Sequence, residues 1–297
     1  YGLKARYTMH LLKRSANKDA DMEKVLEYVN NSFESAEEQA AFDVYDANNI
    51  NPLYGFFVAR AGLGASESMR SKLAEYNDPR LSRAFITKQG TSGKEQAPGT
   101  ADNAVYAPNG TPEQGTSKYG TSLFMYSISA PTLLLSYHEL KFLEAEALCR
   151  LERDAKSALK DAVVAGLLNA ENSFTISRKE LGKTLINAAS SITEAEAESY
   201  FDNTIEAKYT AEPLKTTMTQ KYFALWGASG EATESYNDVR RMKGLGENFI
   251  ELKNPNSFPL RCPYGNSDTT TNAEVKAAYG NGQYVYSENV WWAGGSR

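Results

Sequence analysis

The sequence predicts an all-α protein, mostly helical and interrupted by long irregular loops. Apolar residues recur at helical spacing through most of the chain, as in Ala155, Ala158, Leu159 and Ala162. Prolines and glycines end these apolar stripes, and the alternation of apolar and polar residues that is typical of strands is scarce. We therefore expect helices to form the core and strands to contribute little.

Composition agrees with a globular protein and argues against several functions. Of the 297 residues, 41% are hydrophobic and 23% are charged, as in folded domains. The net charge of −5 does not indicate a nucleic-acid-binding surface. No apolar run reaches the roughly 18 residues of a membrane-spanning helix. The 2 cysteines, Cys149 and Cys262, are too few for a disulfide framework, and whether they pair stays open.

The first segment has the pattern of a helix interior. Leu3, Tyr7, His10 and Leu11 fall on one face of a helix, which we take as its apolar face. No capping residue precedes this segment, so we expect the chain to be part of a longer protein.

Two amphipathic segments after Pro131 are separated by a short turn at Glu152–Asp154, which predicts a helical hairpin. Such hairpins are the unit of TPR-like layers, although the strict TPR consensus and a 34-residue repeat are missing. Thr193 and Glu196 form a capping box that opens a further helix. The apolar residues of that helix are Ala197, Tyr200, Phe201 and Ile205.

Two segments lack helical periodicity. Residues 87–122 are rich in Gly, Thr, Asn and Pro, and a loop of this length is usually functional or mobile. Residues 254–297 are rich in Pro, Gly and Asn, and we expect no helix there. The predicted organisation is thus a helical scaffold over residues 1–86 and 130–246, a long polar loop at 87–122 and an irregular C-terminal segment at 254–297.

The stretch from Ser136 to Arg150 begins with His138-Glu139, as zinc-protease motifs do. The second histidine of that motif would fall at Phe142, and 2 histidines in the whole chain are too few for a His-based zinc site. Nucleophile motifs of Ser and Cys are also missing. We therefore expect no metal, no cofactor and no enzyme activity. A glycoside hydrolase stays an alternative, because it needs only two carboxylates about 5–10 Å apart across a cleft.

Glu144 lies on the apolar stripe of the same segment, between Leu140 and Leu148. A carboxylate in that position requires a charged or hydrogen-bonding partner. Arg240 and Arg241, on a later helix, are the candidates. We expect a structural ion pair between Glu144 and one of these arginines.

Several segments resemble one protein family, in the same order along the chain. "LKFLEAEA" at 140–147 is similar to the family pattern Leu-x-x-Glu-Ala-Glu-Ala, and the segment from Phe258 is similar to the family's Pro-x-Arg-x-x-Tyr-Pro. The chain resembles the SusD/RagB family of outer-membrane nutrient-binding lipoproteins, in its starch-binding branch. It departs from the family at Gly265, where Pro is usual, and at Asp268, where Glu is frequent. The resembling segments are Gly2–Leu11, Asn51–Arg60, Asn77–Leu81, Ala130–Ala147, Gln220–Gly246 and Phe258–Asn272.

The resemblance implies a SusD-like fold, in which residues 1–297 form the C-terminal two-thirds of a nutrient-binding domain. It also implies a binding protein on the surface of the outer membrane, attached by a lipid anchor that this chain lacks. Its ligand would be a glycan, and its partner a SusC-like TonB-dependent transporter. The alternative is a TPR-like scaffold protein that binds a peptide or a protein.

Glycan binding requires exposed rings and polar side chains on a preformed surface. The candidates lie in the long polar loop. We expect Trp226 to be in the core and Trp291 and Trp292 to pack against the scaffold. The predicted ligand-binding residues are Asn103, Tyr106, Asn109 and Tyr119.

Overall fold

The structure is a computed structural model that describes most of the chain. It covers residues 1–60, 63–89, 94–96, 105–111, 115, 118–181, 190–227, 229–254, 257–290 and 295. The chain divides into two compact units, Tyr1–Leu252 and Lys253–Arg297, and each is described by itself.

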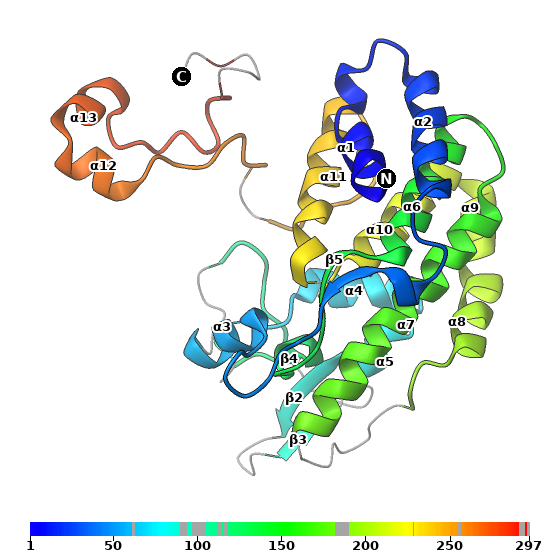
Figure 1. The fold of residues 1–297 in the computed structure, drawn as a ribbon. Coiled ribbons are helices and arrows are strands. Elements are labelled where there is room, and N and C mark those ends of the chain that lie inside the picture. Colours follow the sequence, from blue (N-terminus) through cyan, green and yellow to red (C-terminus); the bar gives the residue numbers. More distant parts are fainter. Residues whose placement is uncertain are drawn as a thin grey trace. The chain divides into compact units, whose positions relative to one another are not determined.

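The larger unit is built from helices, as the sequence predicts (Figure 1). None of the described helices is both long and apolar enough to cross a membrane. The short 3₁₀ segments are η1 (Leu12–Arg14), η2 (Ala36–Glu38), η5 (Leu123–Met125) and η7 (Ser229–Glu231), and η6 (Phe201–Ile205) is a π-helix. The α-helices of this unit are α1 (Gly2–His10), α2 (Lys18–Asn30), α3 (Pro52–Arg60), α4 (Glu67–Glu75), α5 (Arg80–Arg83), α6 (Tyr137–Arg150), α7 (Lys156–Leu181), α8 (Glu194–Tyr200), α9 (Glu206–Ala211), α10 (Pro213–Ala224) and α11 (Ala232–Leu245).

Short strands interrupt the helices, including within the segment that we expected to be irregular. β1 (Ala40–Phe42) pairs with β5 (Thr132–Leu135), and β2 (Phe85–Gln89) lies between β3 (Lys94–Gln96) and β4 (Thr121–Ser122); all these pairs are antiparallel. The prediction of a loop without strands over residues 87–122 is therefore wrong at its ends. The strands there have 5, 3 and 2 residues, too few to show an alternating pattern.

The predicted helical hairpin is present as α6 and α7. The Ser136 hydroxyl accepts a hydrogen bond from the backbone N–H of Glu139 (3.1 Å) and thereby caps α6. The chain leaves α6 through Glu152, whose φ of 55° is left-handed. Buried apolar residues of α6 and α7 pack with Ile192, Tyr200 and other residues of the α8–η6 region in one core cluster.

Helix α1 buries the face opposite to the one predicted. Leu3, Tyr7 and Leu11 are 48%, 55% and 64% exposed, whereas Ala5 and Met9 are completely buried. The reason is a close approach, since a Cβ at position 2 would lie 2.5 Å from a methyl group of Leu135. The small residues of α1 allow this contact, and the periodicity of large apolar residues does not reveal it.

The smaller unit contains two short helices, α12 (Asn266–Thr271) and α13 (Ala273–Tyr279). The rings of Tyr264 and Tyr279 stack at a centroid distance of 4.4 Å, and the guanidinium of Arg261 lies 4.7 Å from the centroid of Tyr264. The prediction that this segment has no helix is wrong. With 6 and 7 residues, these helices are too short and too polar to give a helical pattern in the sequence.

Two glycines with positive φ, Gly227 and Gly246, differ in the space that surrounds them. Gly227 (φ 76°) lies against the ring of Phe124, which a Cβ would overlap, whereas a Cβ at Gly246 (φ 82°) would meet nothing within 4 Å.

We expect Gly246→Ala to lower the free energy of unfolding by about 1 kcal/mol through backbone strain. Gly227→Ala should lower it by about 2–4 kcal/mol, because overpacking adds to the strain. Urea denaturation followed by circular dichroism measures both, and equal losses would contradict the role of the Phe124 contact.

Candidate ligand-binding site

The His138-Glu139 pair lies in the interior and not at a catalytic surface. Both side chains are buried, and the Glu139 carboxylate accepts hydrogen bonds from the guanidinium of Arg6, one of them from Nε at 2.8 Å. Among the described residues, no group of three or more His, Cys, Asp or Glu is arranged to hold a metal ion. The glutamate of this motif therefore joins α6 to α1.

The predicted ion pair of Glu144 is wrong, and its neighbour Glu146 has the expected role. Glu146 is completely buried and accepts a hydrogen bond from Nη2 of Arg241 at 2.8 Å and another from Nε of Arg150 at 2.7 Å. Glu144 instead accepts a hydrogen bond from Lys141 at 2.6 Å, and Arg240 is exposed. Helix α6 is buried around most of its circumference, so Glu144 lies on its narrow accessible edge.

Charge compensation governs the protonation of this network. Burial alone would raise the pKa of Glu146, but the positive charges of Arg241 and Arg150 hold it well below its usual range. The same attraction raises the pKa of Arg241 although burial opposes it. Arg150 extends the network to Glu247 through bonds of 2.8 and 2.9 Å, and Lys221 of α10 lies 2.8 Å from Asp238 of α11. Glu146, Arg150 and Arg241 therefore remain ionised in the folded protein.

The surroundings of a second buried group, Glu231, favour its protonated form. Burial, together with the nearby charge of Glu139, raises the pKa of Glu231 well above its usual range. Its Oε2 lies 3.8 Å from Nε2 of His138, and burial lowers the pKa of His138 to about 3. Nδ1 of His138 lies 2.9 Å from the amide nitrogen of Asn169, which assigns the ring proton to Nε2. Burial thus favours the neutral form of both groups, which face each other next to the Arg6–Glu139 ion pair.

The structure buries the two rings that were predicted to bind ligand. Tyr106 and Tyr119 are 8% and 7% exposed, so the expectation that these rings face solvent is wrong. The ring of Tyr106 packs edge-on against Phe85 at 5.4 Å, and the guanidinium of Arg70 lies 4.9 Å from its centroid. Backbone hydrogen bonds tie both segments to Ala65, and this pairing draws the rings inward.

Asn103, Trp291 and Trp292 lie outside the described residues. The Asn109 carbonyl accepts a hydrogen bond from the hydroxyl of Ser66 at 2.8 Å, and its side chain is half-buried. Ligand binding by Asn103, Tyr106, Asn109 and Tyr119 stays a prediction.

Trp226 packs between Phe85 and Phe124, each at 5.2 Å, as expected for a core residue. Cys149 and Cys262 are both free.

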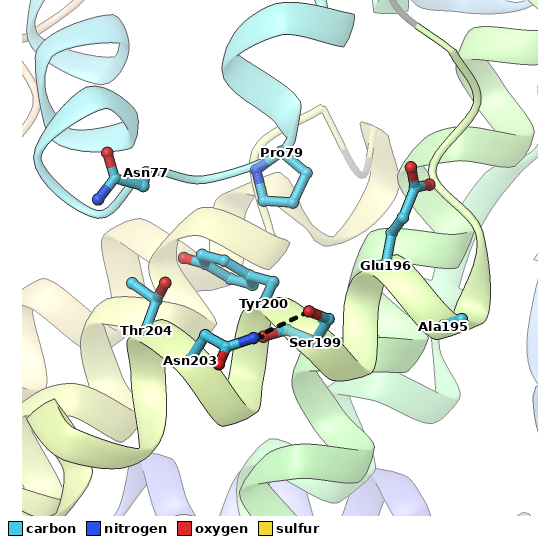
Figure 2. A pocket seen from close by; sticks show the side chains of 8 residues that line it. All are labelled: Asn77, Pro79, Ala195, Glu196, Ser199, Tyr200, Asn203 and Thr204. Atoms are coloured by element: carbon cyan, nitrogen blue, oxygen red, sulfur yellow. Dashed lines mark hydrogen bonds between the residues drawn. The ribbon is translucent and has the colours of Figure 1, made fainter.

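A groove of about 540 Å³ opens between the turn that joins α4 to α5 and the helical segment α8–η6 (Figure 2). Tyr200 lies between the two walls, below Pro79. The remaining lining residues are polar with one exception: Asn77, Ala195, Glu196, Ser199, Asn203 and Thr204. Amide and hydroxyl groups in a surface groove can donate hydrogen bonds to a polar ligand and accept them from it.

The sequence contains a helical face that indicates one wall of this groove, but the apolar stripe beside it drew attention to the core instead. Glu196, Ser199, Tyr200, Asn203 and Thr204 recur at i, i+3, i+4, i+7 and i+8, which is one helical face. Tyr200 contributes to the predicted apolar stripe and is buried, while its polar neighbours flank that stripe. The predicted capping box is confirmed, because the Thr193 hydroxyl and the Glu196 carboxylate each accept a backbone N–H.

The fold and the groove define a class, namely a helical protein with an open, largely polar surface groove. The family described as "Starch-binding associating with outer membrane" matches residues 2–264. The chain therefore belongs to the SusD-like family. No curated protein sequence matches it.

Solved structures agree with this assignment. A SusD/RagB family protein from Bacteroides thetaiotaomicron is 66% identical over 100% of this chain and 64% of its own, with a TM-score of 0.91. SusD homologues from Bacteroides fragilis and Bacteroides uniformis are 20% and 19% identical, with TM-scores of 0.65 and 0.59. They align with 96% and 98% of this chain, and with 64% and 63% of their own. The chain thus spans somewhat less than two thirds of the length of these proteins, and the two distant homologues support the fold alone.

Glu146 and Glu144 form a matched pair for testing the buried network. We expect Glu146→Ala to lower the free energy of unfolding by about 3–5 kcal/mol, because it leaves Arg241 buried without its main partner. Glu144→Ala removes only the half-exposed contact with Lys141 and should cost less than about 1 kcal/mol. Guanidinium denaturation of the two variants measures the difference. Similar losses would contradict the assignment of Glu146 as the structural glutamate.

Glu231 and His138 make opposite contributions to the pH dependence of stability. Above its usual pKa of 4.5, Glu231 keeps a proton in the folded state that the unfolded state has lost, so stability falls as pH rises. His138 binds its proton at 6.5 in the unfolded state but at about 3 when folded, so stability rises with pH between these values. The two slopes offset each other from pH 4.5 to 6.5, and above that only the Glu231 contribution remains.

Glu231→Gln tests this balance by keeping the group neutral at every pH. Above pH 6.5, the free energy of unfolding of the wild type should fall relative to the variant, by about 1.4 kcal/mol per pH unit while Glu231 stays protonated in the folded protein. Urea denaturation from pH 5.5 to 8.5 provides the comparison. Glu34→Gln, at an exposed position, should run parallel to the wild type. A parallel curve for Glu231→Gln would show that Glu231 is already ionised.

Proposed function

We propose that this chain captures glycans at the outer membrane and delivers them to a SusC-like TonB-dependent transporter. The observation that carries this proposal is the family match over residues 2–264, because the family is described as starch-binding and associated with the outer membrane. In this proposal the protein is held at the cell surface by a lipid anchor and acts by binding, without catalysis.

The geometry of the larger unit supports a binding role. Several of its buried ionisable groups form ion pairs that connect helices, as Glu146 and Arg241 do. The groove beside Tyr200 instead exposes amides and hydroxyls, which suit neutral polar ligands. A rigid frame with a polar surface site fits a protein that captures and releases its ligand unchanged.

A second candidate function is a scaffold that binds a peptide or a protein. The exposed face of α1 favours it, because Leu3, Tyr7 and Leu11 present apolar side chains at helical spacing on the surface. Such a face is the kind of surface against which another helix packs.

Titration calorimetry of the full chain distinguishes the two functions. We expect saturable binding of at least one neutral oligosaccharide from a set of maltoheptaose, xylohexaose and mannohexaose. Reducing ends, measured in parallel, should not increase during the incubation. Failure of all three sugars to bind would contradict glycan capture, and the release of reducing ends would contradict a purely binding role.

A further inference from the structure

We propose that the groove over Tyr200 is a subsite for one neutral sugar unit of a glycan. This inference rests on the glycan-binding function proposed above, and it assigns that function to particular residues. The volume of about 540 Å³ falls within the range of about 300–1,000 Å³ that is typical of small-molecule sites. Two stretches of chain distant in sequence form its walls, one with Asn77 and Pro79 and one with Ser199, Asn203 and Thr204 (Figure 2).

The floor of the groove is Tyr200, whose ring is only 7% exposed and is held by hydrogen bonds from below, so that it supports the two walls and offers little of its face to a ligand. The Tyr200 hydroxyl donates a hydrogen bond to Asp78 at 3.3 Å and accepts one from the amide of Gln220 at 3.5 Å. Asp78 is itself held by bonds of 2.8 and 2.6 Å from the guanidinium of Arg80, and both residues are buried. A preformed ring loses little conformational entropy when a ligand binds. Pro79 lies beside it and, being only half-buried, offers an apolar face for the C–H groups of a sugar (Figure 2).

The walls of the groove offer unused hydrogen-bonding groups. The Asn203 amide nitrogen donates to the backbone carbonyl and to the hydroxyl of Ser199, each at 2.9 Å, which directs its carbonyl oxygen away from that contact. The side chains of Asn77 and Thr204 have no hydrogen-bond partner among the residues that the structure describes. Donors and acceptors are therefore both available, as the hydroxyl groups of a sugar require.

The charge of the groove selects against acidic ligands. Of the 8 lining residues, Glu196 alone carries a charge, and no cation is among them. Backbone and side-chain hydrogen bonds from Thr193 lower the pKa of Glu196, so it remains ionised. A carboxylate without a neighbouring cation in the lining repels phosphate and uronic acid groups. The preferred ligand is consequently neutral.

Both walls have unusual backbone conformations that set the direction of these side chains. Asn77 has a left-handed φ of 48°, and Phe201–Ile205 is a π-helix in which the N–H of Glu206 donates to the carbonyl of Phe201. Left-handed residues other than glycine and single π-turns are found frequently at functional sites. Here each of them lies in or next to the groove.

Asn77→Gly and Thr204→Val remove single polar groups from the groove. Glycine accepts the left-handed φ of position 77, and valine has the shape of threonine, so both variants should fold. We expect each to weaken binding of the neutral oligosaccharide by about five- to tenfold, as the loss of one hydrogen bond does. In the wild type, the side-chain amide resonances of Asn77 and Asn203 should shift during the titration.

Glu152→Gly and Thr210→Val are the matched controls, because Glu152 is also left-handed and Thr210 is an exposed helical threonine outside the groove. Both should bind as the wild type does. Unchanged affinity in Asn77→Gly and Thr204→Val, with no amide shifts, would overturn the subsite and leave glycan binding intact. No binding of maltoheptaose, xylohexaose or mannohexaose would overturn both proposals. Amide shifts caused by an eight-residue peptide of alternating Asn and Ser, without shifts caused by the sugars, would also overturn the subsite.

Discussion

The ion network around Glu146 connects the elements on which the rest of the larger unit depends. Glu146 lies in the C-terminal part of α6, and its partners are Arg241 of α11 and Arg150 at the end of α6. Arg150 then reaches Glu247, beyond the end of α11. Because a buried charge without its partner is costly, arrangements of these helices that separate Glu146 from Arg241 are disfavoured. The network thus specifies the packing more than it adds to net stability.

Both walls of the groove are attached to this core. Its helical wall, α8–η6, packs through Tyr200 and Phe201 against the core cluster of α6 and α7. Its other wall follows α4, and Asp78 and Arg80 hold the turn below it. The groove is therefore formed by short elements that are anchored to the helical core. This division allows the lining side chains to differ without loss of the fold.

The sequence predicted the α6–α7 hairpin because the apolar stripes of both helices are long. It predicted the start of α8 from the capping box at Thr193. The prediction failed where the outcome depends on contacts between segments that are distant in the sequence. The choice between Glu144 and Glu146 depends on how completely α6 is surrounded, and the buried face of α1 depends on a close approach at Gly2. The groove joins two segments more than a hundred residues apart, and a single helical face indicates only half of it.

The location of the ion pairs has a consequence for the response of the protein to salt. Pairs in the interior, such as Glu146 with Arg241, are shielded from counterions and persist at any physiological ionic strength. The pairs of Lys156 with Glu206 and of Lys160 with Asp202 are exposed and join α7 to the helices that form one wall of the groove. Dissolved ions weaken only this second set. Added salt is therefore expected to weaken the exposed contacts between α7 and the segment Asp202–Glu206, while the buried pairs and the apolar packing of Tyr200 and Phe201 keep the frame and the wall in place.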